Sequence, residues 1–224
     1  MAGKKWKKLL KICLVGCIVE MVALSGCGAA GQEIMDEEGI RSYLDSLESY
    51  EAQISVTFYS NKNENTYLVR QQAQKDGKYR MEILEPAEFS GVTTLSDGQS
   101  VMQTDPSIRG MVKAKNTPIR ETLLLHTFIK NYTPGDGTFS QDEEGTAVMK
   151  AAYSSGTDKV ASGVLRFNTA TRQPESLEIL DRAGNVSLRI LYRSFEANKE
   201  LVPELFEIGG GEESGTEQSQ PANP

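Results

Sequence analysis

The chain has 224 residues, with 24 lysines and arginines, 31 aspartates and glutamates, one histidine and a formal net charge of −7 at pH 7. This length is enough to bury one sizeable hydrophobic core. The acidic balance argues against binding nucleic acid or anionic lipid headgroups through bulk electrostatics.

Residues 1–26 have the plan of an export signal, in which a basic start precedes an apolar stretch. The apolar runs extend from Ile12 to Val19 and from Met21 to Leu24. They are too short for a stop-transfer helix, because a bilayer span needs about 20 apolar residues. The basic residues are Lys4, Lys5, Lys7, Lys8 and Lys11.

The stretch Leu24-Ser25-Gly26-Cys27 resembles a bacterial lipobox, in which the cysteine thiol takes a diacylglyceryl group and the cysteine becomes the new N-terminus. We therefore predict a signal peptide over residues 1–26, a lipidated tether over residues 27–35, and a covalent diacylglyceryl and acyl lipid (palmitate) on Cys27. Two or more acyl chains hold a protein durably on a membrane. This predicts an anchor on the extracytoplasmic face of the cell membrane; the alternative is an ordinary signal peptide with a chance cysteine.

The predicted mature chain is strongly acidic and has no usable thiol. The leader carries five lysines and one glutamate, so 19 basic and 30 acidic residues remain, a net charge of −11. Cys13 and Cys17 leave with the leader, and Cys27 is acylated. We therefore expect no disulfide and no cysteine-based metal site, and stability must come from packing.

After the tether, residues 33–50 are expected to form a helix, because Ile40, Tyr43, Leu44 and Leu47 recur at helical spacing. The apolar period then changes to two, which is typical of strands with one buried face. Turn signals such as Asp76-Gly77 and Asp97-Gly98 separate the strands, so this part is predicted to be an antiparallel meander. The predicted strands cover residues 50–59, 66–74, 79–83, 91–95, 100–104 and 110–114.

Thr117 and Pro118 are predicted to open a second helix, as its N-cap and first position, and the helix is expected to continue over residues 119–132. A helix this apolar must be covered by the sheet or cover a pocket in it. Residues 201–208 are expected to add an edge segment, and the polar tail 209–224 is expected to be disordered. Further strands are predicted over residues 146–153, 159–168, 175–180 and 185–195.

These elements predict a mainly β protein of the α+β class. About ten strands should form a strongly curved antiparallel sheet, or half-open β-barrel, with two helices against its concave side. The domain should extend over residues 36–208. If the helices fill the concavity it is only a core, and if they leave space it is a binding groove.

Side chains suited to catalysis are scarce. His126 is the single histidine and lies in the apolar helix, where a structural role is favoured over a general base. A zinc site would lack its usual ligands, and Asp142-Glu143-Glu144 is interpreted as a solvated turn. The chain has no nucleophile elbow, phosphate loop or dinucleotide fingerprint. We therefore predict a binding protein that is not an enzyme and that uses no metal or non-covalent cofactor.

Several short motifs resemble the LolA-type lipoprotein carriers. The stretch Gly77-Lys78-Tyr79-Arg80-Met81-Glu82, then Pro86 and Ser96-Asp97-Gly98, is similar to that family's strand, proline and hairpin. Residues 163–167, residues 177–185 and the run from Asn198 to Phe206 are similar to its C-terminal elements. The resemblance covers residues 50–208 and implies a LolA-like fold. It departs from the soluble carriers at Cys27, which would fix this chain to one membrane.

A narrower resemblance is to GerS-type germination lipoproteins of anaerobic spore formers. It includes Asn61-Lys62-Asn63, Gln71, Asp105-Pro106-Ser107-Ile108 and Phe128-Ile129-Lys130-Asn131-Tyr132. The resemblance implies a lipoprotein of the forespore or spore membrane that binds and licenses a cell-wall amidase acting on cortex peptidoglycan. No residue that contacts the amidase can be carried over.

Two functional hypotheses follow. The first is a membrane-tethered scaffold that binds a cell-wall amidase through its sheet edge or outer face. The alternative is a carrier of lipid or lipoprotein with an apolar groove under the second helix; a plain core is the simpler interpretation of the same residues. Exposed sheet edges also allow a dimer by strand exchange. The groove-lining candidates are Ile54, Val56, Phe58, Met81, Ile83, Val92, Leu124 and Phe128.

Overall fold

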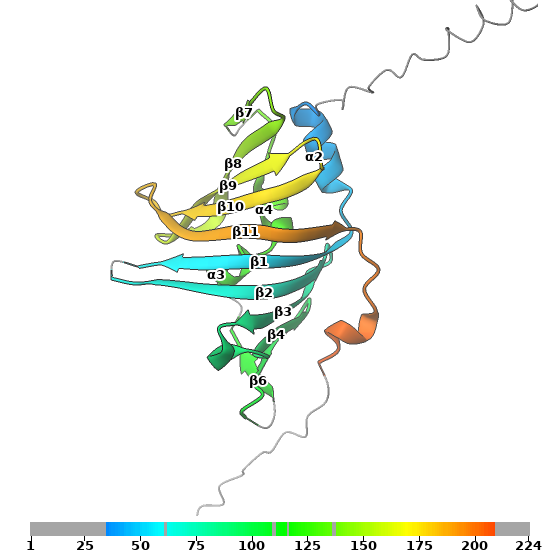
Figure 1. Ribbon diagram of the computed structural model, residues 1–224, viewed down its shortest axis with the longest axis vertical. Coiled ribbons are helices and arrows are strands. Elements are labelled where there is room, and N and C mark those ends of the chain that lie inside the picture. Colours follow the sequence, from blue (N-terminus) through cyan, green and yellow to red (C-terminus); the bar gives the residue numbers. More distant parts are fainter. Residues whose placement is uncertain (1–34, 61, 109–110, 116, 136–137, 209–224) are drawn as a thin grey trace, which may run out of the picture. The chain divides into compact units, whose positions relative to one another are not determined.

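The computed structural model describes residues 35–208, apart from residues 61, 109–110, 116 and 136–137 (Figure 1). The predicted signal peptide, Cys27, most of the tether and the tail from residue 209 lie outside the described residues.

The described residues form one antiparallel sheet of 11 strands in the order β6-β5-β4-β3-β2-β1-β11-β10-β9-β8-β7. Strands β1 and β11, which are far apart in sequence, pair along the middle of the sheet. Short strands β6 and β7 lie at its two edges. The strands are β1 Ser49–Tyr59, β2 Glu64–Gln74, β3 Lys78–Glu85, β4 Thr93–Asp97, β5 Val101–Thr104, β6 Met111–Ala114, β7 Phe139–Gln141, β8 Thr146–Thr157, β9 Val160–Asn168, β10 Gln173–Leu180 and β11 Val186–Ala197.

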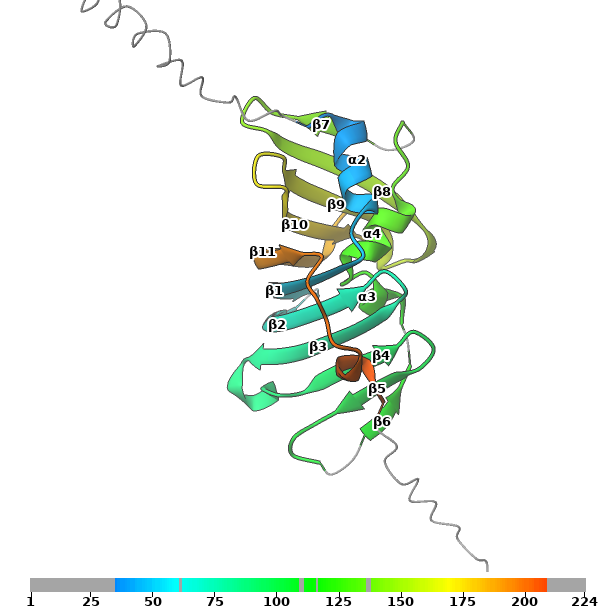
Figure 2. The ribbon, with the colours of Figure 1, turned by 90° about the vertical axis from the view of Figure 1, so that its right-hand side faces the viewer.

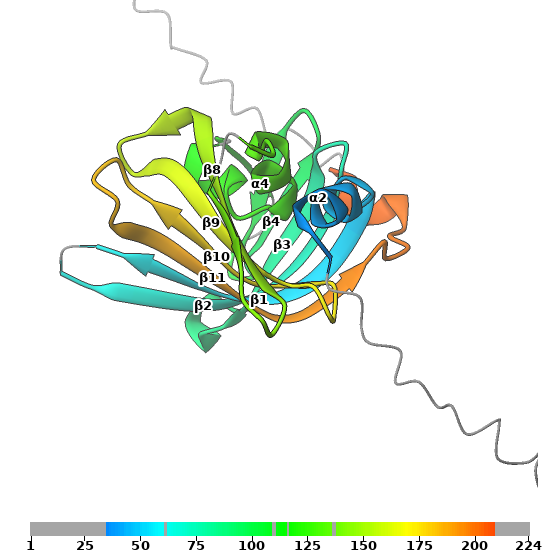
Figure 3. The same cartoon turned by 90° about the horizontal axis from the view of Figure 1, so that it is seen from above.

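The sheet curves around the helices on one side. Figure 3 shows α4 inside the curve, and Figure 1 shows the opposite, convex face of β8–β11, β1 and β2 with none of the described helices over it. The predicted fold class, a strongly curved antiparallel sheet with helices on its concave side, is confirmed. The helices are α2 Glu37–Asp45, α3 Pro118–Glu121 and α4 Leu125–Asn131, with 3-10 turns η1 Ala87–Phe89 and η2 Pro203–Phe206.

Strand alternation explains the position of the core. On β1 the side chains of Ala52, Ile54 and Val56 are buried, whereas Gln53 and Thr57 on the other face are half-buried. Successive side chains of a strand point to opposite faces, so one apolar set faces the helices. Among the described residues, no helix has the length and apolar character needed to cross a bilayer.

The first helix is shorter than predicted. Asp36 caps α2 by accepting a hydrogen bond from the Gly39 amide at 2.8 Å, and the helix ends at Asp45 rather than extending to residue 50. The prediction was wrong there because Ser49 already pairs with Gln74 of β2. Pairing with the sheet therefore overrides the helical spacing of Leu47.

Three further predictions need correction. The second helix is split into α3 and α4, because Leu124 adopts an extended conformation. The segment 201–208 was expected to lie at a sheet edge, but its residues Pro203–Phe206 form η2, which Figure 2 shows beside β3 and β4. There Leu201 and Phe206 bury Leu95 in a small second core. The edge strand β7 was not predicted, because its three residues are too short to show a period.

Candidate binding site on the concave face

A chain of buried hydrogen bonds holds the break between α3 and α4 against the centre of the sheet. The Tyr50 hydroxyl donates to Gln71 Oε1 at 2.8 Å and accepts from the Leu125 amide at 3.0 Å. Gln71 Nε2 then donates to the Leu123 carbonyl at 3.0 Å. Both side chains are fully buried. The backbone groups freed by the helix break are therefore satisfied by the sheet.

Tyr50 reaches this position because β1 begins in the middle of the sheet, where Tyr50 is paired with Ala73 on one side and Ala197 on the other. Its ring lies 5.2 Å from the His126 ring and 5.3 Å from the Phe195 ring, centroid to centroid. Burial raises the pKa of the Tyr50 hydroxyl well above its usual value. The hydroxyl therefore stays protonated and can donate its hydrogen bond to Gln71 Oε1.

His126 has one satisfied and one unsatisfied ring nitrogen. Its Nε2 lies 3.1 Å from the Leu47 carbonyl, which can only accept, so Nε2 carries the proton. Its buried Nδ1 has no hydrogen-bond partner among the described residues. Burial lowers the pKa of His126, with a smaller contribution from Lys75, while the Leu47 carbonyl, Glu48 and Asp76 oppose the shift. The imidazole is therefore held neutral.

Helix α2 clamps the C-terminal end of α4. Arg41 Nη1 donates to the carbonyls of Ile129 at 2.6 Å and Tyr132 at 2.5 Å. The Tyr132 hydroxyl also donates to the Glu37 carboxylate. A cation at a helix C-terminus satisfies free carbonyls and opposes the partial negative charge there. The two helices are therefore joined by polar contacts as well as packing.

A pocket of about 770 Å³ lies where α2, α4 and the turns after β2 and β4 meet. Gly77 and Gly98, which have positive φ angles and lie beside each other, form part of its wall. The neighbouring polar hollow of about 560 Å³ shares Gln74, Lys75 and Asp76 with it. The lining of the larger pocket mixes apolar and polar side chains, among them Leu44, Leu47, Tyr79, Val101, Leu124, Ile129, Lys75, Glu121, His126 and Lys130.

The structure separates the candidate groove-lining residues. Leu124 belongs to the main core and also lines this pocket. Ile54, Val56, Met81 and Phe128 are buried in the main core, and Phe58 and Ile83 pack on that core as partly buried side chains. Val92 is also buried. The candidates therefore belong mainly to the packed interface between sheet and helices.

Phe128 illustrates how closely the concavity is filled. It is fully buried and stacks on Tyr132 with 5.8 Å between ring centroids. A Cβ atom added to Gly163 of β9 would lie 3.1 Å from the Phe128 ring and 2.4 Å from the Tyr153 hydroxyl. The sheet can approach α4 this closely because residue 163 has no side chain.

The acidic run Asp142-Glu143-Glu144 is exposed and forms the turn between β7 and β8, where Asp142 Oδ1 accepts from the Thr146 amide at 2.8 Å. Among the residues that the structure describes, no group of three or more histidine, cysteine, aspartate or glutamate side chains is arranged to hold a metal ion.

Sequence reasoning missed the roles of Tyr50, Gln71 and Arg41. A signal for Gln71 was present, since it occupies the same face of β2 as Tyr67, Val69 and Ala73 and is the polar member of that set. A lone polar residue on an apolar strand face needs a buried partner. No comparable pattern identifies Arg41, whose partners are backbone carbonyls about 90 residues away.

The fold and site define a half-open barrel with α3 and α4 held against its concave face. A pocket lined by both polar and apolar side chains lies at one end. The chain belongs to the sporulation protein YdcC-like family, whose model matches residues 7–206. Sporulation protein YdcC of Bacillus subtilis (strain 168) is 21% identical over 208 residues, which is 91% of this chain and 61% of that protein. The chain thus spans less than two thirds of that relative.

Solved structures to which the chain is similar cover about three quarters of it. An uncharacterized conserved protein from Thermus thermophilus has a TM-score of 0.48 and 15% identity, over 75% of this chain and 91% of that chain. A LolA superfamily protein from Nitrosomonas europaea has a TM-score of 0.45 and 12% identity, over 77% and 98%. The CwlD amidase from Clostridioides difficile in complex with the GerS lipoprotein contributes a match with a TM-score of 0.41 and 21% identity, over 75% and 96%.

The substitution Tyr50→Phe tests the hydrogen-bond chain. It leaves Gln71 and the Leu125 amide buried without their partner, so we expect the free energy of unfolding to fall by about 1–3 kcal/mol. Tyr192→Phe is the matched control, because the buried Tyr192 hydroxyl has no hydrogen-bond partner among the described residues. Urea unfolding of both variants is the measurement. Equal losses in the two variants would contradict the assigned role.

The pH dependence of stability tests the state of His126. Because folding lowers its pKa, the unfolded chain takes up the proton more readily once the pH falls below about 6.5. We expect the free energy of unfolding to decrease as the pH falls from about 7 towards 5, until the folded-state pKa is reached. His126→Gln, which can keep the donor to Leu47, should flatten this dependence in urea titrations. An unchanged slope in the variant would rule His126 out as its source.

Proposed function

We propose that this protein is a non-catalytic, membrane-anchored lipoprotein that binds and licenses a cell-wall amidase in spore formation or germination. The observation that carries the proposal is the family match over residues 7–206 to sporulation proteins. The partner class comes from the sequence resemblance to GerS-type lipoproteins, which runs from Asn61 to Tyr132.

The packing of the concave face supports a scaffold over a lipid carrier. The apolar side chains of α4 that face the sheet, Leu125, Phe128 and Ile129, are buried. The pocket that remains has a mixed lining with Lys75, Glu121, His126 and Lys130, whereas sites for apolar ligands are lined mostly by apolar side chains. This arrangement leaves the convex face and the sheet edges for contact with a protein.

The lipid on Cys27 is part of the same proposal. Helix α2 begins at Glu37, shortly after the predicted anchor, and its contacts through Arg41 and Glu37 join it to α4. A short tether of this kind would hold the domain close to the membrane surface and raise its effective concentration towards a partner in the same compartment.

Capture and reconstitution test the partner. Residues 28–224 immobilised on a resin should recover an amidase from extracts of sporulating cells, and an empty resin should not. With purified components, cleavage of cortex peptidoglycan by that amidase should require the lipoprotein. An extract that yields no amidase, or an amidase equally active alone, would remove the proposal.

Substitution of the lipobox cysteine tests the anchor. Cys27→Ser should move the protein from the membrane fraction to the soluble fraction and remove the acyl mass from the intact-mass spectrum. Cys17→Ser, within the predicted leader, is the matched control and should leave both unchanged. A wild-type protein of unacylated mass would contradict the anchor while leaving amidase binding as a separate question.

A further inference from the structure

One cross-strand row on the convex face combines an exposed apolar side chain with an exposed cation. Residues on six neighbouring strands lie side by side in register: Val148, Arg166, Ser176, Leu191, Ser55 and Leu68, on β8, β9, β10, β11, β1 and β2. Each points away from the concave core, because a strand neighbour of each is buried there: Met149, Leu165, Leu177, Ile190, Ile54 and Val69. The row crosses the middle of the 11-stranded sheet.

Leu191 is the centre of this row. Its side chain is 38% exposed, and the other large exposed apolar residues of the described chain, Phe89, Ile108, Val112 and Val202, lie in turns, loops or the edge strand. The neighbours of Leu191 in the row are Ser55 and Ser176, which are 9% and 8% exposed. Both neighbours in the row are small, and Leu191 is much the more exposed of the three. A single exposed leucine is common on protein surfaces and does not by itself indicate a binding site. Whether Leu191 belongs to one therefore depends on the charged residues near it.

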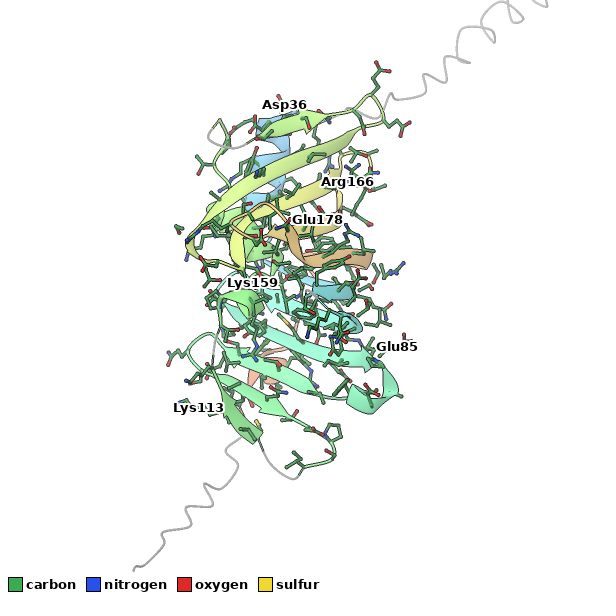
Figure 4. The ribbon with its side chains drawn as sticks, turned by 90° about the vertical axis from the view of Figure 1, so that its left-hand side faces the viewer. Asp36, Glu85, Lys113, Lys159, Arg166 and Glu178 are labelled. Atoms are coloured by element: carbon green, nitrogen blue, oxygen red, sulfur yellow. The ribbon has the colours of Figure 1, made fainter. Side chains whose placement is uncertain are left out.

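The charge in this row is Arg166, which is exposed and forms no ion pair with any described residue. In the adjacent row, by contrast, Arg189 Nε bonds Glu178 Oε1 at 2.8 Å, so that cation is already neutralised. Arg166 and Glu178 lie on neighbouring strands of this face (Figure 4). Arginine next to an apolar centre is a typical composition of protein interfaces.

We propose that the row centred on Leu191 and Arg166 is the docking surface for a folded protein partner that presents an apolar side chain to Leu191 and a carboxylate to Arg166. The predicted mature chain has a net charge of −11, so an acidic partner patch is repelled by the molecule as a whole and attracted at Arg166. The overall repulsion and the local attraction at Arg166 together fix the orientation in which the partner docks. Two copies of this chain would meet with the same strong negative charge, which disfavours self-association through this face.

The identity of this partner rests on the proposed function, which assigns it as the cell-wall amidase. The surface and the partner are separate claims. The first concerns the location of the docking surface and the second concerns the identity of the partner. An experiment can therefore contradict one claim and support the other.

Site-specific photo-cross-linking in sporulating cells tests both claims with the full-length protein. Benzoylphenylalanine replaces Leu191 in one strain, and Val112 of the edge strand β6 or Val202 of the loop before η2 in control strains. A second set of strains adds Arg166→Glu, with Lys113→Glu as the matched charge control. We expect an amidase adduct at position 191, weak adducts at positions 112 and 202, and a loss of about tenfold with Arg166→Glu but not with Lys113→Glu.

The other outcomes are distinct. An amidase adduct at position 112 or 202 but not at 191 overturns this surface and leaves the proposed function standing. A different protein at position 191 whose adduct is lost with Arg166→Glu supports the surface and overturns the amidase as partner. An adduct insensitive to Arg166→Glu, an adduct of the chain with itself, or no adduct at position 191 overturns the docking surface. Thermal unfolding of each variant confirms that the changes at these exposed positions leave the fold intact.

Discussion

The structure depends on the hydrogen bonds of Tyr50 and Gln71 at the centre of the sheet. An apolar helix laid across a concave sheet exposes free backbone groups wherever it breaks, and the break between α3 and α4 lies over buried side chains. The Tyr50 hydroxyl supplies an acceptor and the Gln71 amide supplies a donor to this point, and the two side chains are hydrogen-bonded to each other, so the helices can bend to follow the curve of the sheet. Buried polar groups are costly without partners, and the same groups specify one arrangement when every partner is present.

The position of α3 and α4 determines which surfaces of the protein remain accessible. Because Leu125 and Phe128 fill the concavity, the space left at the end of the sheet nearest the β2–β3 turn is a mixed pocket. The edge strands and the convex face are the remaining surfaces, and none of the described helices covers β8–β11, β1 and β2 (Figure 1). Leu191 and Arg166 lie on that open face.

The C-terminal run from Asn198 to Phe206, which carries part of the resemblance to LolA-type proteins, has a structural explanation. Asn198 adopts a positive φ angle of 52°, and its side chain accepts from the Glu48 amide at 2.9 Å. This turn redirects the chain, and Leu201 and Phe206 then pack on Leu95. Asparagine tolerates the left-handed conformation because its side chain can hydrogen-bond locally. The motif therefore marks how the chain closes beside β3 and β4 and need not mark a binding site.

The sequence by itself determined the strands other than β7, the turns between them and the fold class, because the two-residue period of Ala52, Ile54 and Val56 and turn pairs such as Asp76-Gly77 are local signals. It also singled out Cys27 and the scarcity of catalytic groups. Only the tertiary structure decided where helices stop, since Ser49 pairs with Gln74 of β2 and Leu123 with Gln71, partners that no local pattern specifies. It alone placed Leu191 between two buried serines, with Arg166 in the same row. Those positions depend on the register of six strands, and register is set by packing across the whole sheet.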